Sequence, residues 1–199
     1  MTFGQQMARV ATPVVGSLAL LAAGMATAPT EAEAAPLGRV CMFLAPDGAY
    51  GAGHAAFAFK VRGEKDHWMF GSFGSTTDSP RKGWIKGGTW KKARAHFTNV
   101  KDGKARYYTG YRCVNTRDGD VKRAQSWYTT VKNRGYNVTT NNCLHMSMAA
   151  FKGYSETLRK DTRLRTATGQ TPNVYYKSVL DKAKWEKSHR LDDRPRNKK

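Results

Sequence analysis

Residues 139–151, TTNNCLHMSMAAF, place a cysteine after two asparagines and ahead of a run of small and apolar residues. The apolar residues recur at helical spacing, at Leu144, Met148 and Phe151. Asn142 is a favourable residue to cap a helix start, and Gly153 suits its C-terminal end. The stretch therefore predicts a helix that begins at Cys143 and packs its apolar side onto the rest of the domain.

Three roles are open for Cys143: a buried structural thiol, half of a disulfide, or a nucleophile. The first turn of a helix carries unpaired amide N–H groups and a partial positive charge. That environment stabilises a thiolate and lowers a cysteine pKa below its free value of about 8.5. The helix start therefore fits a nucleophile, while an inert cysteine on an amphipathic helix fits the same pattern without any chemistry.

The chain contains three cysteines, Cys41, Cys113 and Cys143. Thiols pair outside the cytoplasm, so an odd count in an exported protein predicts one disulfide and one remaining thiol. Cys41 in GRVCMFL and Cys113 in TGYRCVN both lie in β-like segments, which makes them the favoured cross-strand pair. Pairing of Cys143 with Cys113 is the alternative, and it would exclude a nucleophilic role.

The first residues are typical of a secretory signal peptide. A segment whose only charge is Arg9 precedes the apolar run VATPVVGSLALLAAGMATA at residues 10–28. Ala32-Glu33-Ala34 is the preferred cleavage site over Ala26-Thr27-Ala28, because a proline follows the latter. A retained membrane anchor is the alternative, but a proline and a glycine interrupt the run. We expect residues 1–34 to be removed and the mature protein to be secreted.

The chain is strongly basic, with 34 Lys and Arg against 15 Asp and Glu and a net charge of +19. Residues 1–34 hold one base and two acids, so their removal leaves 33 bases and 13 acids, or +20. Such a charge predicts an acidic partner: an anionic cell-wall polymer, nucleic acid, acidic polysaccharide or membrane surface. Solubility in an extracellular medium would also account for it.

Strand-like segments come first in the mature chain. Residues 39–46, 54–61, 67–73 and 105–115 read as strands, and the middle two predict a hairpin across the RGEKD turn. Phe57 and Phe59 would share one face of that hairpin. Long loops and one short helix are expected over residues 74–104.

Helical patterns follow the strands. Asp118 or Asp120 can cap a helix with Val121, Ala124, Tyr128 and Val131 at helical spacing, and Thr171-Pro172 begins a last helix. Strands first and helices later predict an α+β fold. We expect one domain over residues 35–185 and a disordered basic tail over residues 186–199.

A cysteine nucleophile in acyl transfer needs a base, normally histidine, oriented by a further polar group. Among the five histidines, His54 stands out because it follows Gly51-Ala52-Gly53 and opens an apolar strand, where it can project toward a helix terminus. His67 opens the next strand beside charged residues. His145 lies two positions from Cys143, so a helix points it elsewhere.

The segments GHAAFAF, HWMFGSF and NNCLHMSMAAF, in this order, resemble the circularly permuted branch of the NlpC-type papain-like superfamily. In that branch, as in lecithin:retinol acyltransferase-like proteins, the catalytic histidine precedes the cysteine. The resemblance covers residues 39–151 and implies a permuted papain-like fold, with the cysteine helix packed on an antiparallel sheet. It also implies thiol chemistry on amide or ester bonds, most often those of peptidoglycan stem peptides in exported bacterial members.

Carried over to this chain, the resemblance implies Cys143 as the nucleophile and His54 as the general base. The third, orienting residue should come from the strand after His54, and here the chain departs from the pattern, because Gly71 falls near the expected position. Ser72 and His67 are the candidates. Asn142 could line an oxyanion site, although capping alone explains it. Without a third residue the chain would be an inactive, binding-only relative.

Residues 80–97, PRKGWIKGGTWKKARAHF, interleave bases with tryptophans. Cationic and aromatic side chains together suit polyanions or sugar rings. The candidate polyanion-binding residues are Trp84, Trp90, Lys91, Lys92 and Arg94. A solvated loop with two packed tryptophans is the alternative. A second hypothesis is therefore a non-catalytic, cationic protein that binds an anionic polymer.

No paired CxxC, GxGxxG or phosphate-loop pattern occurs. We therefore expect no metal site, no nucleotide cofactor and, in the mature chain, no membrane span. The leading hypothesis is a secreted cysteine hydrolase or amidase that acts on cell-wall peptide.

Overall fold

The structure, a computed structural model, describes residues 38–76, 79–98, 108–164 and 166–191. The strands are β1 (Gly38–Ala45), β2 (His54–Lys60), β3 (Trp68–Thr76), β4 (Ser79–Gly88), β5 (Gly110–Thr116) and β6 (His189–Arg190). The helices are α1 (Trp90–Thr98), α2 (Val121–Asn133), α3 (Cys143–Tyr154), α4 (Glu156–Lys160), α5 (Pro172–Val174), η1 (Tyr175–Val179) and α6 (Leu180–Lys182). The predicted α+β class is confirmed, while the predicted signal peptide lies outside the described residues.

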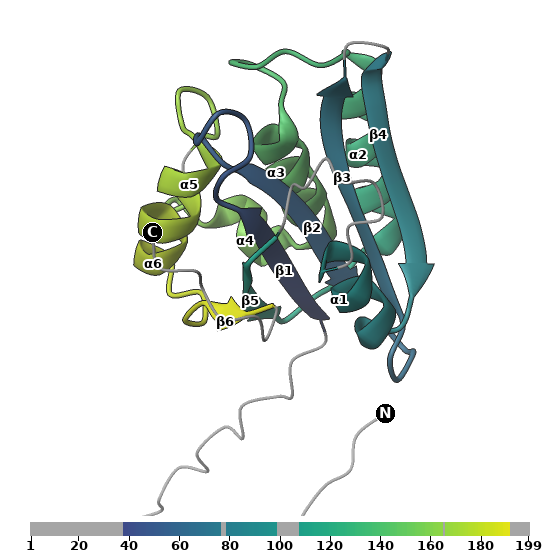
Figure 1. The fold of residues 1–199 in the computed structure, drawn as a ribbon. Coiled ribbons are helices and arrows are strands. Elements are labelled where there is room, and N and C mark those ends of the chain that lie inside the picture. Colours follow the sequence, from purple (N-terminus) through teal and green to yellow (C-terminus); the bar gives the residue numbers. More distant parts are fainter. Residues whose placement is uncertain (1–37, 77–78, 99–107, 165, 192–199) are drawn as a thin grey trace, which may run out of the picture. The chain divides into compact units, whose positions relative to one another are not determined.

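The strands form one antiparallel sheet in the order β4-β3-β2-β1-β5-β6 (Figure 1). The predicted hairpin is confirmed, because β2 and β3 pair antiparallel with Ala56 opposite Ser72 and Phe57 opposite Gly71. Side chains alternate between the two faces of a sheet. Phe57 and Phe59 accordingly share one apolar core, as predicted, and Ala56 belongs to the other.

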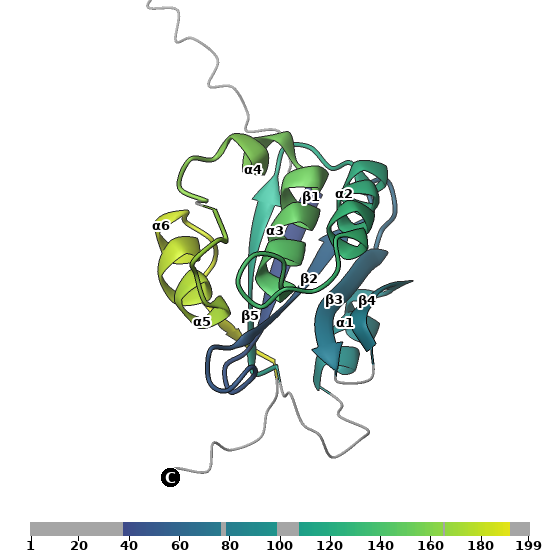
Figure 2. The same cartoon turned by 90° about the horizontal axis from the view of Figure 1, so that it is seen from above.

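Helices cover both faces of the sheet (Figures 1 and 2). α2 and α3 lie side by side on the face that carries Phe57 and Phe59. α1 lies on the opposite face, where Phe97 packs on Phe43 with ring centroids 4.3 Å apart. The central strands β1 and β2 are therefore buried on both sides.

α3 begins at Cys143, as the sequence predicts, and packs over β2. The expectation that Gly153 caps its C-terminal end is wrong, because the helix runs to Tyr154 and Ser155 is the cap. A Cβ atom at Gly153 would lie 3.0 Å from the carbonyl oxygen of Arg123 in α2. The glycine instead lets α2 and α3 approach closely.

α2 and α5 begin where the sequence predicts. The Asp120 side chain caps α2 by accepting a hydrogen bond from the N–H of Arg123. Thr171 caps α5, and Pro172 is the first residue of that helix. The chain continues from α5 through the π-helical η1 into α6. Among the described residues, no helix has the length and apolar character needed to cross a membrane.

β4 replaces part of the loops expected over residues 74–104, and α1 is the short helix expected there. β4 is rich in glycine and bases, which have low β-propensity, so it is recognisable only through its pairing with β3. α1 starts at Trp90, where Thr89 Oγ1 accepts a hydrogen bond from the N–H of Lys92 at 3.2 Å. Residues 99–104 lie outside the described ranges.

The predicted disulfide joins Cys41 in β1 to Cys113 in β5. The two residues are directly opposite in the β1–β5 register and both are buried. The bond links segments 72 residues apart in the chain. It leaves Cys143 as a thiol.

The C-terminal segment packs against β5. The N–H of Glu186 donates to the carbonyl oxygen of Cys113 at 2.9 Å, and Leu191 is buried. Residues 186–191, which the sequence assigns to the basic tail, therefore lie on the folded domain. Residues 192–199 lie outside the described ranges.

Candidate functional site

Cys143 is buried at the first turn of α3, with 3% of its surface exposed. The Asn142 side chain holds this turn, because its Oδ1 accepts hydrogen bonds from the N–H groups of Leu144 at 2.9 Å and His145 at 3.3 Å. Nδ2 of Asn142 donates to the carbonyl oxygen of Val138 at 2.6 Å. The side chain of Asn142 is thus engaged in fixing the helix start, which accounts for the residue without an oxyanion contact.

The sulfur of Cys143 lies at the beginning of β2. The main-chain N–H of Ala55 donates to Sγ, with the N and S atoms 3.4 Å apart. Ala55 directly follows His54, so the fold joins two segments 88 residues apart in the chain. A hydrogen-bond donor aimed at sulfur favours the thiolate over the thiol.

His54 is held by a buried serine. Nε2 of His54 lies 2.9 Å from Oγ of Ser72. Oγ of Ser72 also lies 3.3 Å from the carbonyl oxygen of Ala55 and 3.2 Å from the hydroxyl of Tyr108. His54 and Ser72 are 5% and 4% exposed, so these contacts form away from bulk water.

The contacts of Ser72 assign the tautomer of His54. A serine hydroxyl has one proton to donate and two lone pairs to accept with. The Ala55 carbonyl can only accept, so all three contacts are hydrogen bonds only if Ser72 donates to Ala55 and accepts from His54 Nε2–H and from Tyr108. This assignment, made from the network, puts the ring proton on Nε2 and the basic lone pair on Nδ1.

Replacing Ser72 by alanine is expected to slow the reaction of Cys143 with iodoacetamide at pH 7 by about tenfold, because the tautomer of His54 is no longer held. Tyr108→Phe, which keeps the ring and removes one donor to Ser72, should have a smaller effect. Ser147→Ala is the matched control, since Ser147 is a buried serine of α3 that bonds the Cys143 carbonyl. Equal rates in the Ser72 and Ser147 variants would contradict the assignment.

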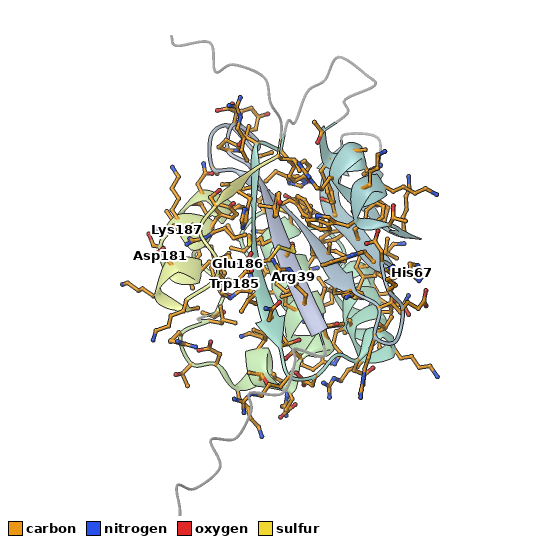
Figure 3. The ribbon with its side chains drawn as sticks, turned by 90° about the horizontal axis from the view of Figure 1, so that it is seen from below. Arg39, His67, Asp181, Trp185, Glu186 and Lys187 are labelled. Atoms are coloured by element: carbon orange, nitrogen blue, oxygen red, sulfur yellow. A yellow bond between two sulfur atoms is a disulfide. The ribbon has the colours of Figure 1, made fainter. Side chains whose placement is uncertain are left out.

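The structure shows why neither His67, the other candidate for the third position, nor Gly71, which falls near that position, orients His54. His67 lies at the β2–β3 turn, half exposed, with Nδ1 2.7 Å from Glu64, and Figure 3 shows it at the outside of the molecule. Gly71 has no room for a side chain, because a Cβ there would lie 2.3 Å from the Trp84 carbonyl oxygen and 2.7 Å from the Phe57 ring. Of the sequence candidates, Ser72 is the one that contacts His54.

A cleft of about 290 Å³ opens over Cys143. Its wall is formed by three loops, around residues 49–53, 136–142 and 169–172. None of the described residues that line it carries a charge, although the whole chain has a net charge of +19. The described wall of the cleft therefore suits an uncharged group.

Gln170 is the cleft residue whose side chain is available to a ligand. The side chains of Asn142 and Thr139 are engaged in hydrogen bonds with nearby groups, and Thr171 accepts from Val174 N–H. The Gln170 amide, half-buried in the cleft wall, makes no hydrogen bond to any residue within the described ranges. It can donate to and accept from a bound amide.

His145 supports the site from its outer side. Nδ1 of His145 lies 3.0 Å from Asn142 Oδ1, and Nε2 lies 3.3 Å from Oγ1 of Thr168. Burial lowers the pKa of His145, which favours the neutral ring. The residue thus connects the helix start to the loop that carries Gln170.

The candidate polyanion-binding residues separate into two groups. Trp84 on β4 is half-buried against His96 of α1, with ring centroids 4.5 Å apart. Trp90 packs on Trp68 at 4.6 Å. The three basic candidates are exposed on α1: Lys91, Lys92 and Arg94.

Sequence reasoning missed Tyr108 and Gln170. Tyr108 precedes β5 in an aromatic-rich stretch and contacts Ser72 only through the folded chain. Gln170 lies in a polar loop with no motif around it. Neither residue carries a local signal, because each acquires its neighbours through packing between distant segments.

The site is a cysteine at a helix start whose sulfur contacts the main-chain N–H of Ala55, the residue after a histidine that is bonded to a buried serine, in an α+β domain. Comparisons with protein-family models, curated proteins and solved structures found no match. No three His, Cys, Asp or Glu side chains in the described ranges are close enough together to hold a metal ion.

Proposed function

We propose that this chain is a secreted cysteine hydrolase of the permuted papain-like type, which cleaves amide bonds. The proposal rests on the contact between Cys143 and the start of β2. There the N–H of Ala55 donates to Sγ, and the adjacent His54 is bonded to Ser72. A helix-start cysteine and a strand-start histidine, in the order His before Cys, support the resemblance noted in the sequence.

The proposed reaction proceeds through a thioester. Nδ1 of His54 takes the proton of the Cys143 thiol, and the thiolate forms a bond to the carbonyl carbon of the amide. The partial positive charge at the start of α3 stabilises the oxyanion. His54 then gives its proton to the leaving amine as the C–N bond breaks. Water, deprotonated by His54, attacks the thioester, which releases the carboxylic acid and restores the thiol.

The uncharged cleft supports a substrate whose groups next to the cleaved bond are small and neutral. Gln170 would pair with an amide of that substrate. Cell-wall peptide is the proposed substrate, on the strength of the resemblance, with cleavage beside an uncharged residue.

Small activated esters test both the chemistry and the neutrality of the cleft. With p-nitrophenyl acetate, the wild-type protein should release a burst of about one p-nitrophenolate per chain and carry the acetyl group on Cys143. The anionic p-nitrophenyl hemisuccinate should acylate Cys143 more slowly, despite the positive charge of the chain. Gln170→Lys places a cation in the cleft and should increase the relative rate with the anionic ester about tenfold.

Thr129→Lys is the control for this charge change, because Thr129 is exposed on α2 and does not line the cleft. Its ratio of the two acylation rates should equal that of the wild type. A burst of p-nitrophenolate that persists in Cys143→Ala would contradict the proposed chemistry. A faster reaction of wild type with the anionic ester would instead contradict only the neutral cleft.

A further inference from the structure

Two adjoining hollows lie on the face of the sheet that α1 covers. Their volumes are about 260 Å³ and 530 Å³, and Asp66 and Trp90 line both of them. We call the continuous depression the aromatic–basic groove. It is defined by Lys60, Lys65, Asp66, Trp90, Lys91 and Arg94.

The groove is separate from the cysteine cleft. None of the described residues that line the groove also lines the cleft. The groove lies on the face of the sheet that α1 covers, whereas Cys143 belongs to the core on the other face. The groove is therefore a second site.

The cations of the groove are not neutralised by neighbouring acids. Arg39 is bonded to Glu186 at 2.7 Å, and Figure 3 shows the two side chains next to each other. In contrast, the four bases of the groove form no ion pair with any residue that the structure describes: Lys60, Lys65, Lys91 and Arg94. Lys60 and Lys65, of the β2–β3 hairpin, line the first hollow, and Lys91 and Arg94, of α1, line the second, so both hollows carry positive charge.

The aromatic side chains form a single cluster of tilted and edge-to-face rings, which we call the aromatic platform. The ring of Trp90 lies 4.6 Å from that of Trp68 and 5.3 Å from that of Tyr111, measured between centroids. Proteins that hold single-stranded nucleic acid stack successive bases on separate aromatic side chains. Because the aromatic rings of the groove pack on one another, they can stack against only one ring of a ligand.

A carboxylate lies where the two hollows meet. Oδ1 of Asp66 accepts hydrogen bonds from Trp68 Nε1–H and from the main-chain N–H of Trp90, both at 3.1 Å. These bonds fix the carboxylate beside the aromatic platform. A fixed carboxylate accepts hydrogen bonds from sugar hydroxyls and repels any anionic group, phosphate or sugar carboxylate, that comes close to it.

We infer that the aromatic–basic groove binds an acidic polysaccharide. One sugar ring lies against Trp90 and donates hydroxyl hydrogen bonds to Asp66. The acidic groups of the neighbouring sugars reach Lys60 and Lys65 in the first hollow and Lys91 and Arg94 in the second. This binding does not depend on Cys143, so a protein without its thiol retains it.

Titration of the protein with polygalacturonate, followed by tryptophan fluorescence at low salt, tests the inference. Polygalacturonate should bind, uncharged dextran should not, and a thymidine oligonucleotide with the same number of charges should bind more weakly. The double variant Lys60→Glu, Lys91→Glu should weaken polygalacturonate binding by about tenfold or more. Asp66→Asn should weaken polygalacturonate binding and strengthen oligonucleotide binding.

The control variant is Lys122→Glu, Lys177→Glu, which makes the same change in net charge at two exposed lysines outside the groove. It should retain binding within about twofold, as expected for distant exposed charges. Equal losses in both double variants, tighter binding of the oligonucleotide, or no binding of polygalacturonate at low salt would each overturn the inference. Binding by Cys143→Ala should match the wild type, which separates this test from that of the hydrolase.

Discussion

Cys143→Ala is expected to abolish the hydrolysis of cell-wall peptides, with a fall in kcat of about 10⁴-fold or more. The proposed reaction needs the Cys143 sulfur as nucleophile, and the other two cysteines are bonded to each other. The substitution removes a single buried atom, so the folded protein should persist. The measurement is the release of new amino groups from soluble muropeptides, with circular dichroism as the check on folding.

Thiol alkylation across pH gives the complementary result. Cys41 and Cys113 are bonded to each other, so Cys143 is the thiol that can react. Its reaction with iodoacetamide should follow an apparent pKa below about 8.5, and His54→Ala should move that value upward. An unreactive Cys143, or muropeptide cleavage by Cys143→Ala at the wild-type rate, would refute the proposed function.

Arg112→Met is expected to lower the free energy of unfolding by about 3 kcal/mol or more. Arg112 is 5% exposed on β5 and holds the C-terminal segment with three donors. They reach the carbonyl oxygens of Glu186 at 2.7 Å and Tyr176 at 2.8 Å, and a carboxylate oxygen of Asp181 at 2.7 Å. Methionine retains the apolar volume but leaves buried carbonyl groups without donors. Urea unfolding, followed by circular dichroism, measures the loss.

Asp181→Asn is the matched control for Arg112→Met. The Asp181 side chain is 70% exposed, so solvent screens its ion pair with Arg112. A loss of less than about 1 kcal/mol is expected. If both variants lose the same stability, the main-chain contacts of Arg112 do not hold the segment.

The strands and helices with strong local patterns were predictable. The β2–β3 hairpin, the helix starts at Asp120, Cys143 and Thr171, and the Cys41–Cys113 disulfide all follow from residue alternation, capping chemistry or cysteine count. These features depend on short-range preferences that each segment expresses by itself.

β4 was not predictable in this way. Its glycines and bases give a weak strand signal, and it forms because β3 offers an unpaired edge. Residues 186–191 likewise read as a charged tail but are held by Glu186 on β5. In both cases the partner strand supplies the stabilisation, so the segment carries little evidence of its own.

The sequence by itself determined the helix start under Cys143 and favoured Cys41–Cys113 as the disulfide. Only the tertiary structure decided that this pairing leaves Cys143 as a thiol, that Ser72 rather than His67 contacts His54, and that the basic groove lies on the face of the sheet that α1 covers. The physical reason is the separation along the chain over which each kind of interaction acts. Capping and alternation act within a few residues, whereas these contacts join segments that meet only when strand register and helix packing bring them together.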